Sequence, residues 1–108
     1  MSLVTNVILS FHLLEARSES PDGEYRYALM YPLNAWLTEQ GYGPFGPDAD
    51  RVAGGTKHLE TPLYVAAFNY LDVDAFMARL RTLPWEYPSA VQVFLQTQEE
   101  NTFRLMAI

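Results

Sequence analysis

The side chains with the widest chemical range in this chain are its two histidines, His12 and His58. An imidazole can carry a proton near neutral pH or bind a metal. Neither histidine stands at a metal-site spacing such as H-x-H or H-E-x-x-H, and no triad or nucleophile elbow accompanies Ser10 and His12. The chain contains no cysteine, which removes thiolate ligands and nucleophiles. The sequence therefore predicts no catalytic residue, no metal ligand and no cofactor.

The glycines at residues 41–46 match the dinucleotide fingerprint G-x-G-x-x-G letter for letter. That fingerprint binds a pyrophosphate when it follows a strand and opens a helix. Here it follows a predicted helix, Pro44 and Pro47 remove two N–H donors, and Asp48 would repel phosphate. The segment instead predicts the end of a helix and a turn-rich loop.

A second glycine segment, at residues 54–58, is a candidate loop for an anion or another ligand. Gly54 and Gly55 would let the backbone approach a ligand closely, while Lys57 supplies charge and His58 a titratable group. The Lys lacks the glycine spacing and the following Ser or Thr of a Walker phosphate loop. A flexible hairpin with two exposed side chains is the simpler interpretation.

The elements that must position these residues are clearest between residues 63 and 97. Asp72 is suited to cap a helix, Asp74 suits its positive end, and Pro84 would stop it after Leu83. The apolar face of this helix repeats at i, i+3, i+4 and i+7 through Val73, Phe76, Met77, Leu80 and Leu83. Strands are predicted on both sides of it, at residues 63–71 and 91–97.

The other predicted elements complete a single domain of residues 1–108. A strand covers residues 4–14, a turn residues 20–23 and a second helix residues 32–40, with Gly41 as its C-terminal glycine. Residues 25–31 can form a strand or belong to a helix that starts near Glu24. Residues 41–60 form a long loop that could include an edge strand at 56–59, and residues 102–107 pair with 91–97 as a terminal hairpin.

This order of elements predicts an α+β fold. It resembles the split βαβ arrangement of ferredoxin-like domains, with an antiparallel sheet of four or five strands, two helices on one face and a C-terminal hairpin. The resemblance concerns architecture, and folds of this type serve many unrelated functions.

The face of the sheet left uncovered by helices is the second candidate site. If Leu9 and Phe11 face the helices, then aromatic and polar side chains share the opposite side: Ser10, His12, Tyr64, Phe68, Tyr70, Gln92, Phe94 and Gln96. Aromatic side chains there could stack on nucleobases or bury against a protein. Because the net charge is −6 and glutamines rather than lysines or arginines accompany the aromatics, the pattern favours a protein partner or a second copy over nucleic acid.

These observations favour a small, non-catalytic protein-interaction module, acting as a homodimer or with another protein through the sheet face or the 41–60 loop. A cytoplasmic location is expected, since there is no cysteine, no signal-peptide pattern at residues 3–14 and no apolar run of about 18 residues that could span a membrane. One alternative is a small-molecule binder or enzyme whose pocket, near His12, Tyr64, Lys57 and His58, is enclosed by sheet-to-sheet dimerisation. RNA binding by the open face is the other.

Overall fold

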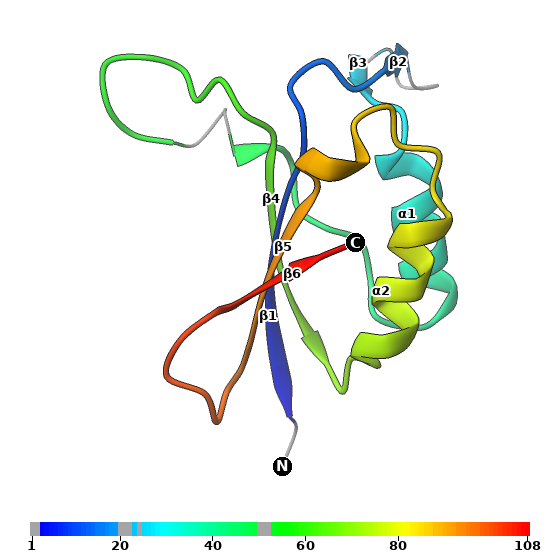
Figure 1. Cartoon of the computed structure of the whole chain (residues 1–108), viewed down its shortest axis with the longest axis vertical. Coiled ribbons are helices and arrows are strands. Elements are labelled where there is room, and N and C mark those ends of the chain that lie inside the picture. The colour runs from blue at the N-terminus through cyan, green and yellow to red at the C-terminus, as the bar shows by residue number, and fades with distance from the viewer. Residues whose placement is uncertain (1–2, 20–22, 24, 50–52) are drawn as a thin grey trace.

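Two helices pack on one side of a four-stranded antiparallel sheet, and none of the described residues forms a helix on the other side (Figure 1). A computed structural model describes residues 3–19, 23, 25–49 and 53–108 of the chain. The elements in chain order are β1 (Val4–Ser10), β2 (Arg17–Glu19), β3 (Tyr25–Tyr27), α1 (Met30–Glu39), β4 (Leu63–Asn69), α2 (Val73–Thr82), the 3-10 turn η2 (Pro88–Ala90), β5 (Gln92–Thr97) and β6 (Arg104–Ala107). The predicted α+β class is confirmed.

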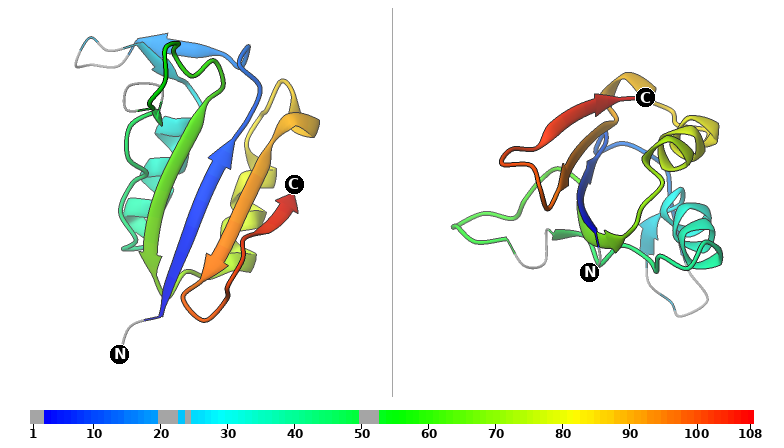
Figure 2. Two further views of the ribbon diagram at one scale, coloured as in Figure 1. Left: turned by 90° about the vertical axis from the view of Figure 1, so that its left-hand side faces the viewer. Right: turned by 90° about the horizontal axis from the view of Figure 1, so that it is seen from below.

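The main sheet has the strand order β4-β1-β5-β6, and every neighbouring pair is antiparallel. The strands β4 and β5 therefore run in the same direction on either side of β1, and α2 connects them. Figure 2 shows the four strands side by side with both helices behind them. A separate two-stranded sheet joins β2 to β3.

The core lies between the sheet and the helices because β1 alternates strictly along its length. Its side chains at Thr5, Val7 and Leu9 are buried, whereas the residues between them are only half-buried. The side chains that meet them in the core include Leu33 and Leu37 of α1, Phe68 of β4, Phe76 and Leu80 of α2, and Val93 and Leu95 of β5.

Helix α2 confirms the prediction at both ends. The Asp72 carboxylate accepts a hydrogen bond from the Ala75 backbone N–H at 3.0 Å, which satisfies one of the unpaired donors of the first turn. At the other end Leu83 is already extended, as a residue before proline prefers to be. Local signals at each terminus are sufficient to define this helix.

Helix α1 begins at Met30, two residues earlier than predicted. Pro32 thus lies in the first turn, where a missing N–H breaks no helical hydrogen bond. The helix ends as expected, with Gly41 at φ +84°. Gly41 N–H donates to Thr38 C=O and Tyr42 N–H donates to Leu37 C=O, the pair of bonds that forms a Schellman motif.

Several predicted strand boundaries are wrong. Strand β1 ends at Ser10 rather than at residue 14, because Ser10 pairs with the first residues of β4 and β5 and nothing in either strand lies beyond them. The chain then turns, and Glu15 N–H donates to His12 C=O. Strand β4 ends at Asn69, because Tyr70 has a φ of +53° that breaks the extended conformation. Residues 56–59 form no edge strand.

A short hairpin flanks the predicted turn at residues 20–23. Its second strand lies within residues 25–31, for which a strand was one of the two predictions, whereas its first strand was not predicted. Strand β2 pairs with β3 through Arg17 opposite Tyr27 and Glu19 opposite Tyr25. Gly23 has the positive φ expected of a turn glycine, at +84°. Residues 20–22 of the predicted turn lie outside the described residues.

Candidate functional site

The open face of the sheet carries a row of apolar side chains that crosses all four strands. Val65 of β4 pairs with Ile8 of β1, Ile8 pairs with Phe94 of β5, and Phe94 pairs with Leu105 of β6. Residues that pair directly across an antiparallel sheet share a face, so these four side chains form one continuous band, which we call the apolar row. Val65 is 48% exposed and Leu105 58% exposed, so the row reaches solvent at both edges of the sheet.

Uncharged side chains surround the apolar row. On one side Asn6 pairs with Gln96, and the Asn6 amide donates to Gln96 Oε1 at 3.4 Å; on the other side Ser10 pairs with Gln92. By strand parity the remaining members of this face are Val4, Leu63, Ala67, Asn69 and Ala107. No strand residue of the face carries a formal charge, although the whole chain carries a net charge of −6.

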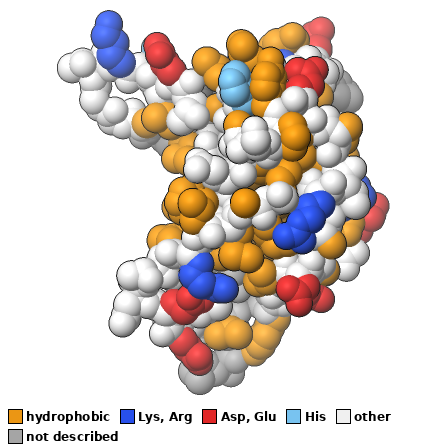
Figure 3. Space-filling model, in the orientation of Figure 1, with side chains coloured by type: hydrophobic (Ala, Val, Ile, Leu, Met, Phe, Trp, Pro, Cys, Tyr) orange, Lys and Arg blue, Asp and Glu red, His pale blue; other side chains and the backbone are white. Residues whose placement is uncertain are grey.

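Two segments project beyond the sheet on its open side. In Figure 1 the 53–60 loop extends past one end of the strands, and the hairpin turn at residues 98–103 extends past the other. The space-filling view shows the profile hollowed between them, with hydrophobic side chains in the hollow (Figure 3). The open face is therefore a shallow concave surface with an apolar centre and a wall at each end.

Two of the predicted face residues are buried on the wrong side for this role. Tyr64 pairs with Leu9, and Phe68 pairs with Thr5, so both side chains point toward the helices and are only 6% and 2% exposed. The prediction placed them on the face opposite Leu9. It was wrong because the facing of β4 depends on its register with β1, which a single apolar strand does not encode.

Phe94 does lie on the open face, half-buried at the centre of the apolar row. Tyr70 is 61% exposed but lies beyond the end of β4, outside the paired strands. That Phe94 and Tyr70 contact a partner stays a prediction.

His12 lies in the turn after β1 and is used there structurally. Its Nδ1 accepts a hydrogen bond from the Leu14 N–H at 3.0 Å, and its ring stacks on Tyr87 with centroids 4.0 Å apart. The nearby Glu15 carboxylate accepts from the backbone N–H groups of Glu86 and Tyr87. Within the described ranges, no group of three or more His, Cys, Asp and Glu side chains could hold a metal ion.

The candidate glycine loop is exposed throughout. Gly54, Gly55, Lys57 and His58 all lie at the surface, and a Cβ added at either glycine would have nothing within 4 Å. The two glycines thus cradle no other part of the chain. Their position in the wall beside the open face makes this loop a candidate contact for a partner seated there.

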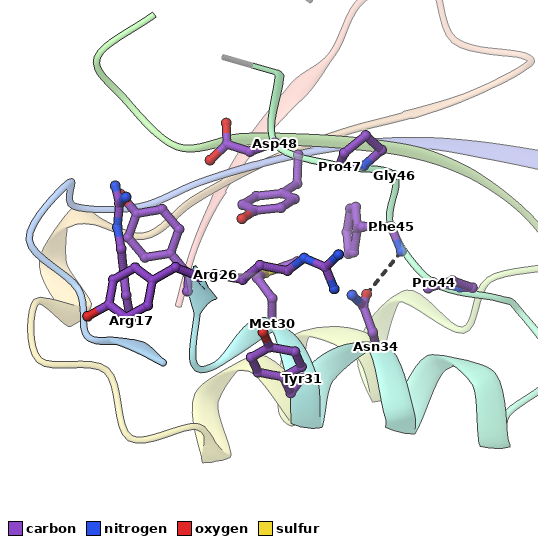
Figure 4. A pocket seen from close by; sticks show the side chains of 13 residues that line it. Arg17, Arg26, Met30, Tyr31, Asn34, Pro44, Phe45, Gly46, Pro47 and Asp48 are labelled. Carbon is purple, nitrogen blue, oxygen red and sulfur yellow. Dashed lines mark hydrogen bonds between the residues drawn. The ribbon is translucent and has the colours of Figure 1, made fainter. Parts of the chain in front are cut away.

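A second hollow, which no local sequence pattern predicted, lies on the helix side of the sheet at the β4 edge. It has a volume of about 510 Å³ and lies between the β2–β3 hairpin, the start of α1 and residues 44–48 (Figure 4). Its lining includes Arg17, Arg26, Tyr31 and Phe45. The one sequence signal was the Tyr25-Arg26-Tyr27 repeat, which combines aromatic and cationic side chains but also suits an ordinary strand.

No family model, curated protein or solved structure matches this chain. Among the described residues, no helix is both long enough and apolar enough to cross a membrane. The open sheet face and the hollow at the β4 edge are therefore the features that indicate a function.

Proposed function

We propose that this chain is a non-catalytic protein-interaction module that forms a homodimer through its open sheet face. The observation that carries the proposal is the apolar row, Val65, Ile8, Phe94 and Leu105, lying uncovered across four strands with uncharged side chains on both sides. An apolar centre with a polar surround is the usual composition of a protein interface. The cysteine-free sequence suits a reducing compartment, and we place the dimer in the cytoplasm.

A second copy suits this face better than a partner of opposite charge. Two acidic chains repel each other wherever their carboxylates approach, but the strand residues of this face contribute none. Asn6, Ser10, Gln92 and Gln96 each have both a donor and an acceptor, so a copy rotated by two-fold symmetry can pair with the same groups. A face of lysines or glutamates could not pair with itself in this way.

The area of the face indicates that a dimer interface must include segments outside the four strands. Four strands spaced about 4.8 Å apart and about 20 Å long present on the order of 400 Å². A stable interface of ordinary size buries about 800 Å² on each partner. The 53–60 loop and the 98–103 turn would have to supply the difference, and strands crossing at a steep angle would let each copy's walls flank the other's sheet.

The strand connectivity supports assigning the sheet to the ferredoxin-like, split βαβ arrangement. Strands β4 and β5 flank β1 in parallel and are joined by α2, as in one half of that arrangement. Strand β6 then extends the sheet beyond β5. The assignment carries no function by itself.

The test is the molar mass in solution by light scattering at about 100 μM, where an interface of ordinary size is largely occupied. Wild type should have about twice the 12.3 kDa mass of one chain. Phe94→Glu buries a charge in the interface and should give a folded monomer. Leu14→Glu adds the same charge at a residue that is 65% exposed away from the face, and should remain a dimer.

A wild-type monomer would overturn the proposal, as would a dimer that Phe94→Glu leaves intact. RNA binding is the less supported function for this face, since its strand residues include no Lys or Arg to meet phosphates. If a single-stranded oligonucleotide bound the wild-type monomer at low salt, RNA binding would become the better supported function of this face.

A further inference from the structure

The hollow at the β4 edge has the composition of a ligand site rather than of a surface groove. Three successive segments within residues 17–48 build it together with Tyr64 of β4: the β2–β3 hairpin, the first turns of α1, and residues 44–48. Gly46 N–H in the last segment donates to Val65 C=O of β4. Its volume of about 510 Å³ lies within the range of pockets that enclose small molecules. It opens on the helix side of the sheet and shares no residue with the apolar row.

Two basic residues in the described part of this acidic chain, Arg17 and Arg26, line the hollow. Arg17 is held in place, because its Nη2 donates to the Tyr27 hydroxyl at 2.7 Å and its Cζ lies 4.3 Å from the centre of the Tyr27 ring. That hydrogen bond raises the pKa of Arg17 above its ordinary value. Arg26 extends into the middle of the hollow in Figure 4. Among the described residues of the lining Asp48 is the one acidic side chain, so the formal charge of these described side chains is positive.

The walls of the hollow are aromatic and mostly rigid. Phe45 and Tyr64 are buried, at 5% and 6% exposure, and Tyr27 is fixed by the bond that its hydroxyl donates to Leu13 C=O at 2.9 Å. Tyr25 is 65% exposed and lies at the edge of the hollow. Flat rings on several sides favour an aromatic guest over an aliphatic one.

Two polar groups at the base of the hollow come from α1. Among the described residues the Tyr31 hydroxyl is buried and makes no hydrogen bond, and Figure 4 shows it directed toward the hollow. A buried hydroxyl without a partner is costly and calls for an explanation, which a ligand would supply. The Asn34 amide is oriented by its Oδ1, which accepts from Phe45 N–H at 3.0 Å.

The start of α1 adds a favourable potential for an anion. No side chain caps this helix, and its first turn contains no acidic residue, so the partial positive charge of its N-terminal end is not offset locally. Met30 and Tyr31 place this end of the helix in the lining of the hollow.

From these observations we propose that the hollow binds a small aromatic carboxylate. The ring would lie against Phe45 and Tyr64, with Tyr25 closing over it. The carboxylate would accept two parallel hydrogen bonds from the Arg26 guanidinium and one from the Tyr31 hydroxyl. A single negative charge suits the site better than a doubly charged phosphate ester, because Asp48 also borders it.

The probe is 2-naphthoate, titrated into the full chain by isothermal calorimetry. It should bind one per chain with a dissociation constant on the order of 1 mM or lower, the range expected for a ligand of this size. Its neutral analogue 2-naphthalenemethanol should bind about ten-fold more weakly, and inorganic phosphate should not compete.

Matched variants distinguish direct contacts with the ligand from a long-range effect of charge on binding. Arg26→Gln should lower the affinity about ten-fold, whereas Arg81→Gln, the same change at an exposed residue of α2, should leave the affinity unchanged. Tyr31→Phe should lower the affinity and at the same time raise the melting temperature of the free protein, because it removes a buried unpaired hydroxyl. Phe94→Glu should bind 2-naphthoate as wild type does, since the site lies on the other side of the sheet.

Four outcomes would overturn the proposal: no saturable binding of 2-naphthoate to wild type, equal affinity for the neutral analogue, an equal loss in Arg26→Gln and Arg81→Gln, or unchanged affinity in a folded Tyr31→Phe. The Tyr31→Phe variant keeps the test decisive if Arg26→Gln fails to fold. None of these outcomes bears on the oligomeric state, so failure of the binding site and failure of the dimer can be told apart.

Discussion

Glu15 joins the turn after β1 to the segment that precedes η2. The residue is only 4% exposed. Its carboxylate accepts from two backbone donors, Glu86 N–H at 3.1 Å and Tyr87 N–H at 2.7 Å, more than 70 residues further along the chain. A carboxylate buried in this way is tolerated because it is fully hydrogen-bonded. No local pattern in the sequence predicts this role, because both donors lie in a distant segment of the chain.

We expect Glu15→Gln to lower the free energy of unfolding by about 2 kcal/mol, since the amide nitrogen must face one of the two N–H groups and leave it unpaired. Urea unfolding measures the change. Glu60→Gln is the control, because it removes the same charge from an exposed loop residue and should cost no more than about 0.5 kcal/mol. Equal effects in the two variants would show that the buried hydrogen bonds contribute nothing specific.

A second residue-scale prediction concerns the cap of α2. Replacing Asp72 by alanine removes the acceptor of the Ala75 N–H and should cost about 1 kcal/mol in urea unfolding. Asp72→Asn keeps an acceptor at the same place and should recover most of that loss. If the alanine and asparagine variants were equally unstable, the negative charge rather than the cap would be the stabilising feature.

At the scale of the element, the two helices differ from the strands in how well the sequence predicted them. The limits of α2 are set by Asp72 and Pro84, and the end of α1 by Gly41, so each depends on neighbours within a turn. The facing of β4 depends instead on its register with β1, more than 50 residues away in sequence. Because residues 63–68 are mainly apolar on both sides, no alternation marked Tyr64 and Phe68 as core residues.

The two candidate surfaces, like the facing of β4, depend on how separate elements pair rather than on a local pattern. The apolar row could be foreseen only at Phe94, since the alignment of Val65, Ile8 and Leu105 with it is a property of the register. The hollow at the β4 edge is lined mainly by residues 17–48, but it forms only when the hairpin, α1 and residues 44–48 pack together beside Tyr64 of β4. Both sites are assembled by pairing between elements rather than by a motif.

The β5–β6 hairpin provides a prediction for pH dependence. The Glu100 carboxylate accepts from Thr97 N–H and contacts Arg104 Nε at 3.0 Å, and the Thr97 bond is the main reason that the pKa of Glu100 is lowered from its ordinary value of 4.5. A group whose pKa is lower in the folded state stabilises the fold above its unfolded-state pKa, and this stabilisation is lost as the pH falls through the folded-state pKa.

Wild type should therefore lose more stability than Glu100→Gln between about pH 7 and about pH 3 in urea unfolding. Glu99→Gln removes the same charge from the exposed neighbouring residue and is the control. Parallel pH profiles for wild type and Glu100→Gln would show that the turn does not depend on the ionised carboxylate.

For the whole molecule, the main contrast is between a strongly acidic chain and a sheet face whose strand residues are all uncharged. In the proposed dimer, apolar and amide contacts, which salt screens little, would hold the two copies together, while their net charges of −6 would repel each other. The proposed ligand site has the opposite character, because an anion there is attracted to Arg26 and Arg17.

We expect the dimer to become tighter as NaCl rises from about 20 mM to about 200 mM, since screening weakens the repulsion between the two acidic chains. Binding of 2-naphthoate should weaken over the same interval. Analytical ultracentrifugation and calorimetry measure the two dissociation constants. Dimer affinity that fell with salt would indicate that ion pairs, rather than the apolar row, hold the copies together.

The central position of β1 also governs how the chain reaches this structure. Strand β1 pairs with β4 on one side and β5 on the other. At its first residue, Val4 N–H donates to Gln98 Oε1, 94 residues away. Contacts between residues so distant in sequence slow folding, because the intervening chain must be ordered before they form. During synthesis β1 therefore leaves the ribosome long before either neighbour exists. The sheet can therefore pair on both sides of β1 only after β5 has been synthesised.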